Sequence, residues 1–347
     1  MTNEKINALA AKAHAMYGKR LKSEDYSNLL ALKNIREIAD YLKGRTSYSS
    51  IFTSTAVNNE LTEELVESLA RERNESLIRK IGSYSYFIGD DLYKLIILES
   101  DIKVILGSAR LIVAPTAREN TYVPDDFCKK HSTLNHKLLY SAETVNDFSQ
   151  ALHGTVYYKM LLPHMNVVAN RFDLSQMEAQ LQDYTYSILE NHCKKNPKSG
   201  SEFKNLINLR ADQFNISLIY RLKKYSDKSN EDIQKHIYSK HGTLSAKQIN
   251  ELISCESDEE YLKILNNTSF ASCIDKDSLD YIEGALENSI YKVYKKYLKQ
   301  STNPDIQVYS FIYLVRNEYR NLVKIIEGKK YNLPEDEILK LIIGYTH

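Results

Sequence analysis

Turn-forming residues are scarce in this sequence, and that scarcity constrains the fold more than any other feature. The chain has 11 glycines and 6 prolines in 347 residues, whereas average usage would supply roughly 42 of the two together. An all-β sandwich or a many-looped α/β barrel needs turn residues at every connection, so both folds are disfavoured. The sequence therefore predicts an all-α protein built from long helices.

Charge and hydropathy narrow the function classes. Lys and Arg total 46 against 45 acidic residues, so the basic excess that neutralises nucleic-acid phosphates is missing and we expect no nucleic-acid partner. No run reaches the ~18 uninterrupted apolar residues of a membrane span, and the first 21 residues lack an apolar signal core. These patterns predict a soluble, cytoplasmic protein with no direct membrane span.

Patterns that would indicate catalysis or a cofactor are missing from the sequence. The histidines show no ligand spacing, and the G-x-x-x-x-G-K-[ST] loop that cradles phosphates does not occur. There is no G-x-S-x-G elbow and no Cys with an ordered His partner. We therefore expect no enzyme activity, metal, nucleotide or other cofactor. We also expect reduced, separate thiols, because no C-x-x-C pair occurs among Cys128, Cys193, Cys255 and Cys273.

One unit recurs three times, and its first mark is the start of a short helix. In each copy a capping side chain precedes an acid by three residues, which satisfies free N–H groups and suits the positive helix end. Apolar residues follow at four and eight positions after the cap, as one face of an amphipathic helix requires. The three caps are Asn34, Thr144 and Ser257.

The end of the short helix recurs as well. A residue tolerant of left-handed geometry is predicted to stop each helix, namely Gly44, Gly154 and Asn267. A threonine then stands two residues before an aromatic, in the pairs Thr46 with Tyr48, Thr155 with Tyr157 and Thr268 with Phe270. The threonines lie 109 and 113 residues apart, so the repeat has the size of a domain rather than of a solenoid unit.

An acid recurs in step with these marks on the long helical stretch that closes each unit. The three acids are Asp101, Asp212 and Glu318. Three residues later stand Val104, Asn215 and Asn321. An acid and an Asn at this spacing share a helix face, so together they can hold a neighbouring helix in register by hydrogen bonds. Catalysis needs acids that converge on one pocket, and copies about 110 residues apart do not predict such a pair, so we expect a structural role.

Two arginines share a spacing from these acids. Arg110 and Arg221 each stand nine residues beyond their acid, about 180° around the helix, which excludes a salt bridge within the helix. Either partner binding or plain solvation explains them equally well. In the third unit Glu327 stands where a base would be expected.

The pattern predicts three helical domains, over residues 1–117, 118–225 and 226–347. It predicts linkers at 112–126 and 225–230 and a basic surface loop at 194–201. The expected helices cover residues 4–21, 34–43, 59–80, 84–112, 144–153, 174–192, 202–224, 229–239, 245–253, 257–265, 278–298, 305–327 and 334–343.

With these residues in view, the chain resembles the C subunit of bacterial and archaeal V-type (A-type) rotary ATPases, which is named d in the eukaryotic enzyme. The resemblance spans almost the whole chain. It includes the N-terminal stretch 13–30, the Thr–aromatic ends, and residues 101–110 and 212–221. Its most specific part is the stretch from Phe311 to Leu322, which contains Arg316, Glu318 and Asn321 and continues into residues 326–338.

The resemblance implies a funnel of three similar helical domains that sits on the cytoplasmic face of the membrane rotor ring. Its mouth would receive the tip of the rotor shaft, subunits D and F. Such a subunit is a non-catalytic coupling piece of the central stalk of an ATPase or ATP synthase that transports protons or sodium ions, and it binds no nucleotide. The alternatives are a cytoplasmic helical-repeat scaffold for another protein partner and an enzyme of unknown chemistry.

Overall fold

The computed structural model describes residues 3–54, 61–89, 91–114, 122–195, 200–238, 240–274 and 279–345. Across these residues the chain is helical almost throughout, and the only strands described are two of two residues each. The all-α prediction is therefore confirmed. The chain divides into two compact units, which we call the middle unit (residues 79–200) and the terminal unit (residues 2–78 with 201–347).

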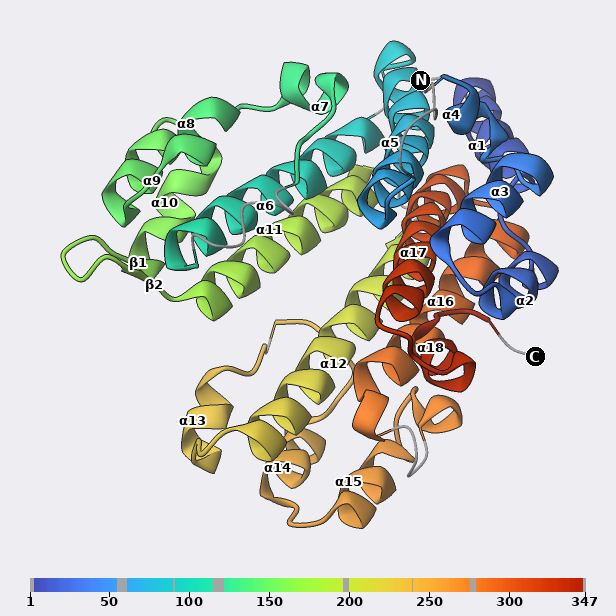
Figure 1. Cartoon of the computed structure of the whole chain (residues 1–347). Coiled ribbons are helices and arrows are strands. Elements are labelled where there is room, and N and C mark those ends of the chain that lie inside the picture. The colour runs from blue at the N-terminus through green and yellow to red at the C-terminus, as the bar shows by residue number, and fades with distance from the viewer. Residues whose placement is uncertain are drawn as a thin grey trace. The chain divides into compact units, whose positions relative to one another are not determined.

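Two long helices and a set of short ones form the middle unit. Helices α6 (Leu92–Val113) and α11 (Leu174–Lys195) pack against each other, and α7 to α9 pack on α6 (Figure 1). The short elements are α7 (Asp126–His131), α8 (His136–Ser141), α9 (Val145–Leu152), α10 (Val156–Leu161), the 3₁₀ turn η2 (Leu162–His164), and the antiparallel strands β1 (Met165–Asn166) and β2 (Arg171–Phe172). Their apolar faces bury one core around Val104, Phe148 and Leu161.

In the terminal unit, helix α17 (Pro304–Lys330) is the central element. It packs against α1 (Asn3–Tyr17), α3 (Ile35–Arg45), α16 (Ile282–Gln300) and α18 (Glu335–Leu341). Its residues Leu322, Ile325 and Ile326 share a core with Leu29, Leu42 and Phe52 from the start of the chain. The unit also contains α2 (Ser23–Ala31), α4 (Ser49–Ser54), α12 (Gly200–Tyr225), α13 (Asn230–Lys235), α14 (Ala246–Ser254), α15 (Asp258–Leu265), η4 (Ala271–Cys273) and η5 (Leu279–Tyr281), and α5 spans Glu63–Phe87.

The predicted helix starts are confirmed in all three copies. The side chains of Asn34, Thr144 and Ser257 each accept a hydrogen bond from the backbone N–H of the acid three residues later. The predicted Thr ends also recur, because each threonine hydroxyl donates to a carbonyl of the last helical turn before it. These pairs are Thr46 with Leu42, Thr155 with Leu152 and Thr268 with Leu265.

The predicted left-handed stops hold in one copy of three. Gly154 has φ +83°, so it uses the conformational freedom of glycine. Gly44 instead lies inside α3, and Asn267 is not among the residues with positive φ, so at both the prediction is wrong. Helix α3 instead ends with Thr46 in an extended conformation, and α15 (Asp258–Leu265) ends with Asn266 in the right-handed region, so neither end uses a left-handed residue.

Some boundaries also differ from the sequence prediction. The helix expected over 84–112 begins at Leu92, because α5 continues to Phe87 and Gly89, at φ +74°, separates the two helices. Helices α2, α4, α7, α8 and α10 were not predicted. All but α2 have six residues, which is fewer than two turns, so they show little of an apolar stripe. Residues 115–121 and 196–199 of the expected connections lie outside the described residues. The three-domain boundaries stay a prediction.

The turn between α17 and α18 explains why residues 326–338 contain a glycine and an asparagine at Gly328 and Asn332. Asn332 takes a left-handed conformation at φ 54°, and Leu333 donates its N–H to the Gly328 carbonyl at 2.8 Å. This is the Schellman arrangement that ends a helix and reverses the chain. A Cβ on Gly328 would lie 2.5 Å from a carbon of Ile338, so only glycine lets α18 pack this closely.

Candidate functional site: three buried acids and an ion network

Asp101 lies in the middle of α6, where it is 2% exposed. Its carboxylate accepts hydrogen bonds from the hydroxyl of Ser132 at 2.6 Å and from that of Tyr157 at 2.8 Å. Burial raises the pKa of Asp101 to about 6, against the two hydroxyl donors, which lower it. The acid thus ties α6 to the end of α7 and to the start of α10, with neutral donors only.

Asp212 holds the corresponding place in α12, but its donors are mainly backbone groups. The N–H of Thr243 reaches Oδ1 at 2.9 Å, the hydroxyl of Thr243 reaches Oδ2 at 2.6 Å, and the N–H of Leu244 reaches Oδ1 at 3.2 Å. Three residues on, Asn215 accepts from the N–H of Tyr238 and donates to its carbonyl, at 2.9 and 2.8 Å. The pair therefore fixes the backbone that leads from α13 into α14.

Glu318 in α17 is the third acid, and it alone has a charged partner among the hydrogen bonds described for the three. Its carboxylate accepts from the N–H of Leu21, the hydroxyl of Tyr48 and the guanidinium of Arg73, at 2.8, 2.9 and 3.0 Å. Burial raises the pKa of Glu318, although Arg73 and the other donors act in the opposite sense. Asn321 repeats the behaviour of Asn215, because it accepts from the N–H of Ile343 and donates to its carbonyl.

The three acids share a rule. Asp101 and Asp212 each bind a residue 31 positions later, Ser132 and Thr243, near the start of the next predicted unit. Glu318 instead takes its donors from residues earlier in the chain, namely Leu21, Tyr48 and Arg73. The spacing of acid and Asn predicted that they hold one neighbouring helix in register. The partners instead lie mostly at helix ends and in connections, so the acids fix these segments.

The Thr–aromatic ends complete two of the three sites. The aromatics Tyr48 and Tyr157 donate their hydroxyls to Glu318 and Asp101. Phe270 holds the third position, fully buried, and has no hydroxyl to offer Asp212. The backbone N–H groups of Thr243 and Leu244 serve that acid instead. The aromatic of the Thr–aromatic end thus serves as a donor to the acid in two of the three sites, and in the third Thr243 and Leu244 replace it.

The arginines singled out by sequence have different surroundings. Arg110 is exposed in the last turn of α6. Arg221 is exposed on α12 and makes a 3.5 Å ion pair with Glu283, whose side chain is also exposed. Arg316 lies on α17, two residues before Glu318, and burial lowers its pKa to about 10. Neither Arg110 nor Arg221 bonds to one of the three acids, and none of the contacts described joins Arg316 to them.

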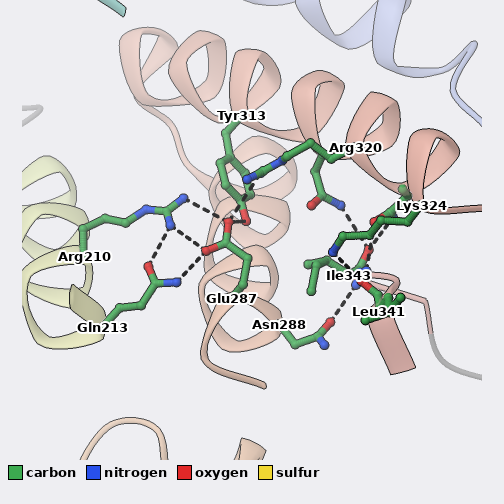
Figure 2. A network of polar contacts seen from close by, with 12 residues as sticks. Arg210, Gln213, Glu287, Asn288, Tyr313, Arg320, Lys324, Leu341 and Ile343 are labelled. Carbon is green, nitrogen blue, oxygen red and sulfur yellow. Dashed lines mark hydrogen bonds and ion pairs between the residues drawn. The ribbon is translucent and has the colours of Figure 1, made fainter. Parts of the chain in front are cut away.

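An ion network that the sequence did not predict connects three long helices of the terminal unit. Glu287 of α16 receives Arg210 at 2.7 Å and Gln213 at 2.6 Å, both from α12. From α17 it receives the Tyr313 hydroxyl at 2.7 Å and Arg320 at 3.4 Å. Figure 2 shows the Glu287 carboxylate between these two sets of donors.

The charges on these donors decide the protonation state of Glu287. Burial by itself would raise the pKa of its carboxyl, but Arg210 and Arg320, with the hydrogen bonds of Arg210 and Gln213, outweigh it and lower the pKa to about 2. The side chain is 12% exposed. The carboxylate is therefore charged at neutral pH and acts as the common acceptor of the three helices. Arg210 stands two residues before Asp212, inside the repeated stretch, which is the one signal that could have pointed to this network.

The C-terminal segment is held beside the same network (Figure 2). Asn288 accepts from the N–H of Gly344 at 2.6 Å, and Asn317 joins Asn321 in donating to the Ile343 carbonyl. Lys324 donates to the carbonyl of Leu341. Residues 341–344 are thus fixed to α16 and α17 by side-chain bonds to their backbone.

These groups act as structural ties, by which we mean buried hydrogen bonds and ion pairs that join one helix or connection to another. Every acid described above is occupied by donors from the chain itself. Among the described residues no group of three or more His, Cys, Asp or Glu side chains is arranged to hold a metal ion. Cys128, Cys193 and Cys255 form no disulfide with one another, and the side chain of Cys273 lies outside the described set. None of the helices described is both long and apolar enough to span a membrane.

Comparison with known proteins identifies the family. The family described as ATP synthase (C/AC39) subunit matches residues 9–341. The chain belongs to this family. It is similar to the A-type ATP synthase C subunit of Methanocaldococcus jannaschii, at 26% identity over 60% of this chain and 54% of that protein. It is also similar to the A-type ATP synthase C subunit of Methanosphaera stadtmanae, at 20% identity over 96% of this chain and 86% of that protein. The match thus spans about half of the first relative and most of the second.

Proposed function

We propose that this chain is a non-catalytic central-stalk subunit of a rotary A-type ATPase or ATP synthase. It joins the rotor shaft, formed by subunits D and F, to the membrane rotor ring, and it sits peripherally on the cytoplasmic face of the membrane. ATP-driven or ATP-forming chemistry then takes place in other subunits. This chain carries torque between shaft and ring during proton or sodium transport.

The observation that carries the proposal is membership of the ATP synthase (C/AC39) subunit family over residues 9–341. The two relatives reported above both bear the name of the A-type ATP synthase C subunit. A part that transmits torque must resist shear, and buried, hydrogen-bonded ties between elements supply such resistance. A fully satisfied buried polar network rigidifies and specifies a unique arrangement.

The buried hydrogen bonds and ion pairs support this proposal because they resist sliding of one helix along another. The network at Glu287 joins α12, α16 and α17, and the Glu318 ties join α17 to the start of the chain. These connections stand beside apolar cores, so sliding of one helix along another would break charged hydrogen bonds as well as packing. A catalytic subunit would instead need converging groups left available for substrate.

The proposal is tested by co-sedimentation of the purified chain with detergent-solubilised rotor ring and, separately, with the D and F shaft complex. We expect the chain to bind both, through interfaces of at least standard size, about 1,200 to 2,000 Å² buried. Binding to neither by a folded chain would overturn the rotor proposal and favour a scaffold for another protein.

A further inference from the structure

The C-terminal half of α16 presents a face of lysines. Lys292, Lys296 and Lys299 are exposed, and Lys295 is half-buried beside them. Their spacing of three, four and seven residues places all four on one side of the helix, within about 10 Å along its axis. The opposite side of the same turns, with Ile290, Tyr294 and Leu298, is buried.

No acid balances this face within α16. The sequence contains no Asp or Glu between Glu287 and Asp305. In the described part of the chain, no ion pair joins Lys295, Lys296 or Lys299 to a carboxylate. Lys295, Lys296 and Lys299 therefore form like-charged neighbours, with spacings of i,i+3 and i,i+4 that destabilise a helix.

Arg20, which follows the end of α1, adds a further positive charge near Lys295. Burial lowers the pKa of Lys295, and the positive charges of Lys299 and Arg20 lower it further. Arg20 follows α1 and stacks over the ring of Tyr17 at 4.3 Å, while Lys295 lies 5.8 Å from the ring centroid of Tyr291. Arg20, Lys295 and Lys299 thus form one positive surface from two separate segments.

From this geometry we infer that the lysine face of α16, with Arg20 at its edge, is a docking surface for the acidic face of a helix in a protein partner. The inference rests on the proposed function, because a subunit of the rotor would supply that helix. A row of glutamates at the same helical spacing would meet the row of lysines along its length. Complementary charge of this kind speeds association and fixes registration between partners.

The other anionic occupants fit the surface less well. A helix that binds a bilayer inserts an apolar face, and the apolar face of α16 is buried against the protein core. A single phosphate is best held by convergent backbone N–H groups at a helix N-terminus, whereas these lysines extend in a row toward the C-terminal end of α16. An extended acidic helix matches the row.

The test uses two synthetic helical peptides of the same length. The acidic peptide carries glutamates on one face at i, i+4 and i+7, and its control carries glutamines there. We expect the full chain to bind the acidic peptide in a salt-dependent way and not to bind the control. The triple variant Lys295→Gln, Lys296→Gln, Lys299→Gln should bind the acidic peptide at least about tenfold more weakly.

A matched variant controls for the loss of three charges. Lys43, Lys137 and Lys263 are exposed lysines on three other helices, and changing all three to Gln should leave peptide binding unchanged. Glutamine is a good helix former, and removing like charges should leave the thermal midpoint of the α16 variant unchanged or raised. Equal binding of the peptide to both triple variants, or a folded wild-type chain that ignores the peptide, would overturn the inference. Binding to phosphatidylserine vesicles but not to the peptide would overturn it in favour of a membrane surface.

The outcomes also separate this inference from the proposed function. Peptide binding needs no rotor component, so it can fail while the chain still co-sediments with shaft and ring. In that case the rotor proposal stands and the lysine face is excluded as the docking surface. If the peptide binds but neither shaft nor ring does, the surface stands as an acidic-helix site and the rotor assignment is lost.

Discussion

Replacement of Asp101 by Asn should remove a pH dependence of stability that the structure assigns to one side chain. The Asp101 pKa is about 6 in the folded protein, against about 3.9 in an unfolded chain. The folded state therefore holds the proton more tightly, and the stabilisation from this group is complete below about pH 4 and lost as the pH rises through 6. Between pH 4.5 and pH 8 the wild-type chain should lose about 2 kcal/mol from this group, and the Asn variant should not.

Hydrogen exchange followed by mass spectrometry reads this difference locally. The segment to follow is α7 to α10, because Ser132 and Tyr157 hold Asp101 there. Relative to wild type at each pH, protection of this segment in Asp101→Asn should rise by about thirtyfold between pH 4.5 and pH 8. Glu143→Gln, at an exposed carboxylate of the same unit, should show a constant ratio. A ratio that stays constant for Asp101→Asn as well would refute the assignment.

Three further changes test the remaining ties. Glu287→Gln should lower the free energy of unfolding by about 3 kcal/mol at pH 7, because it removes the charged acceptor of the partly buried Arg210. Since the pKa of Glu287 is lowered to about 2, the loss should disappear as urea titrations are carried from above pH 5 toward pH 2. Tyr48→Phe should cost about 1.5 kcal/mol in the same titrations by removing one donor to Glu318, and a cost near zero would show that the bond contributes nothing. Gly328→Ala should lower the thermal midpoint, because the new methyl group would overlap Ile338, whereas Gly107→Ala, where no atom lies within 4 Å, should not.

Local features of the fold could be predicted from the sequence because their causes are local. The caps at Asn34, Thr144 and Ser257 depend on a side chain and on N–H groups three residues away, and all three are present. The short helices such as α7 and α10 could not be predicted, because six residues do not complete two turns of an apolar stripe. They are stabilised by packing, α7 on α6 and α10 on α9 and α11, rather than by a pattern of their own.

The sequence predicted the acids of the site but not their partners. The common period of Asp101, Asp212 and Glu318 revealed that these acids matter, and the Asn after two of them marked the same face. The sequence did not reveal their partners, because contacts that join residues far apart depend on the complete fold. Glu287 stayed hidden for the same reason, since nothing on α16 marks it and its partners come from α12 and α17.

The central claim is that this chain couples the shaft to the ring, and the most direct test is transport in a reconstituted complex. ATP hydrolysis and ATP-driven ion uptake would be measured together in vesicles, with the complex assembled with and without the chain. We expect hydrolysis to persist without it while uptake falls to background, and added wild-type chain to restore uptake. Undiminished uptake in complexes shown to lack the chain would contradict the coupling role.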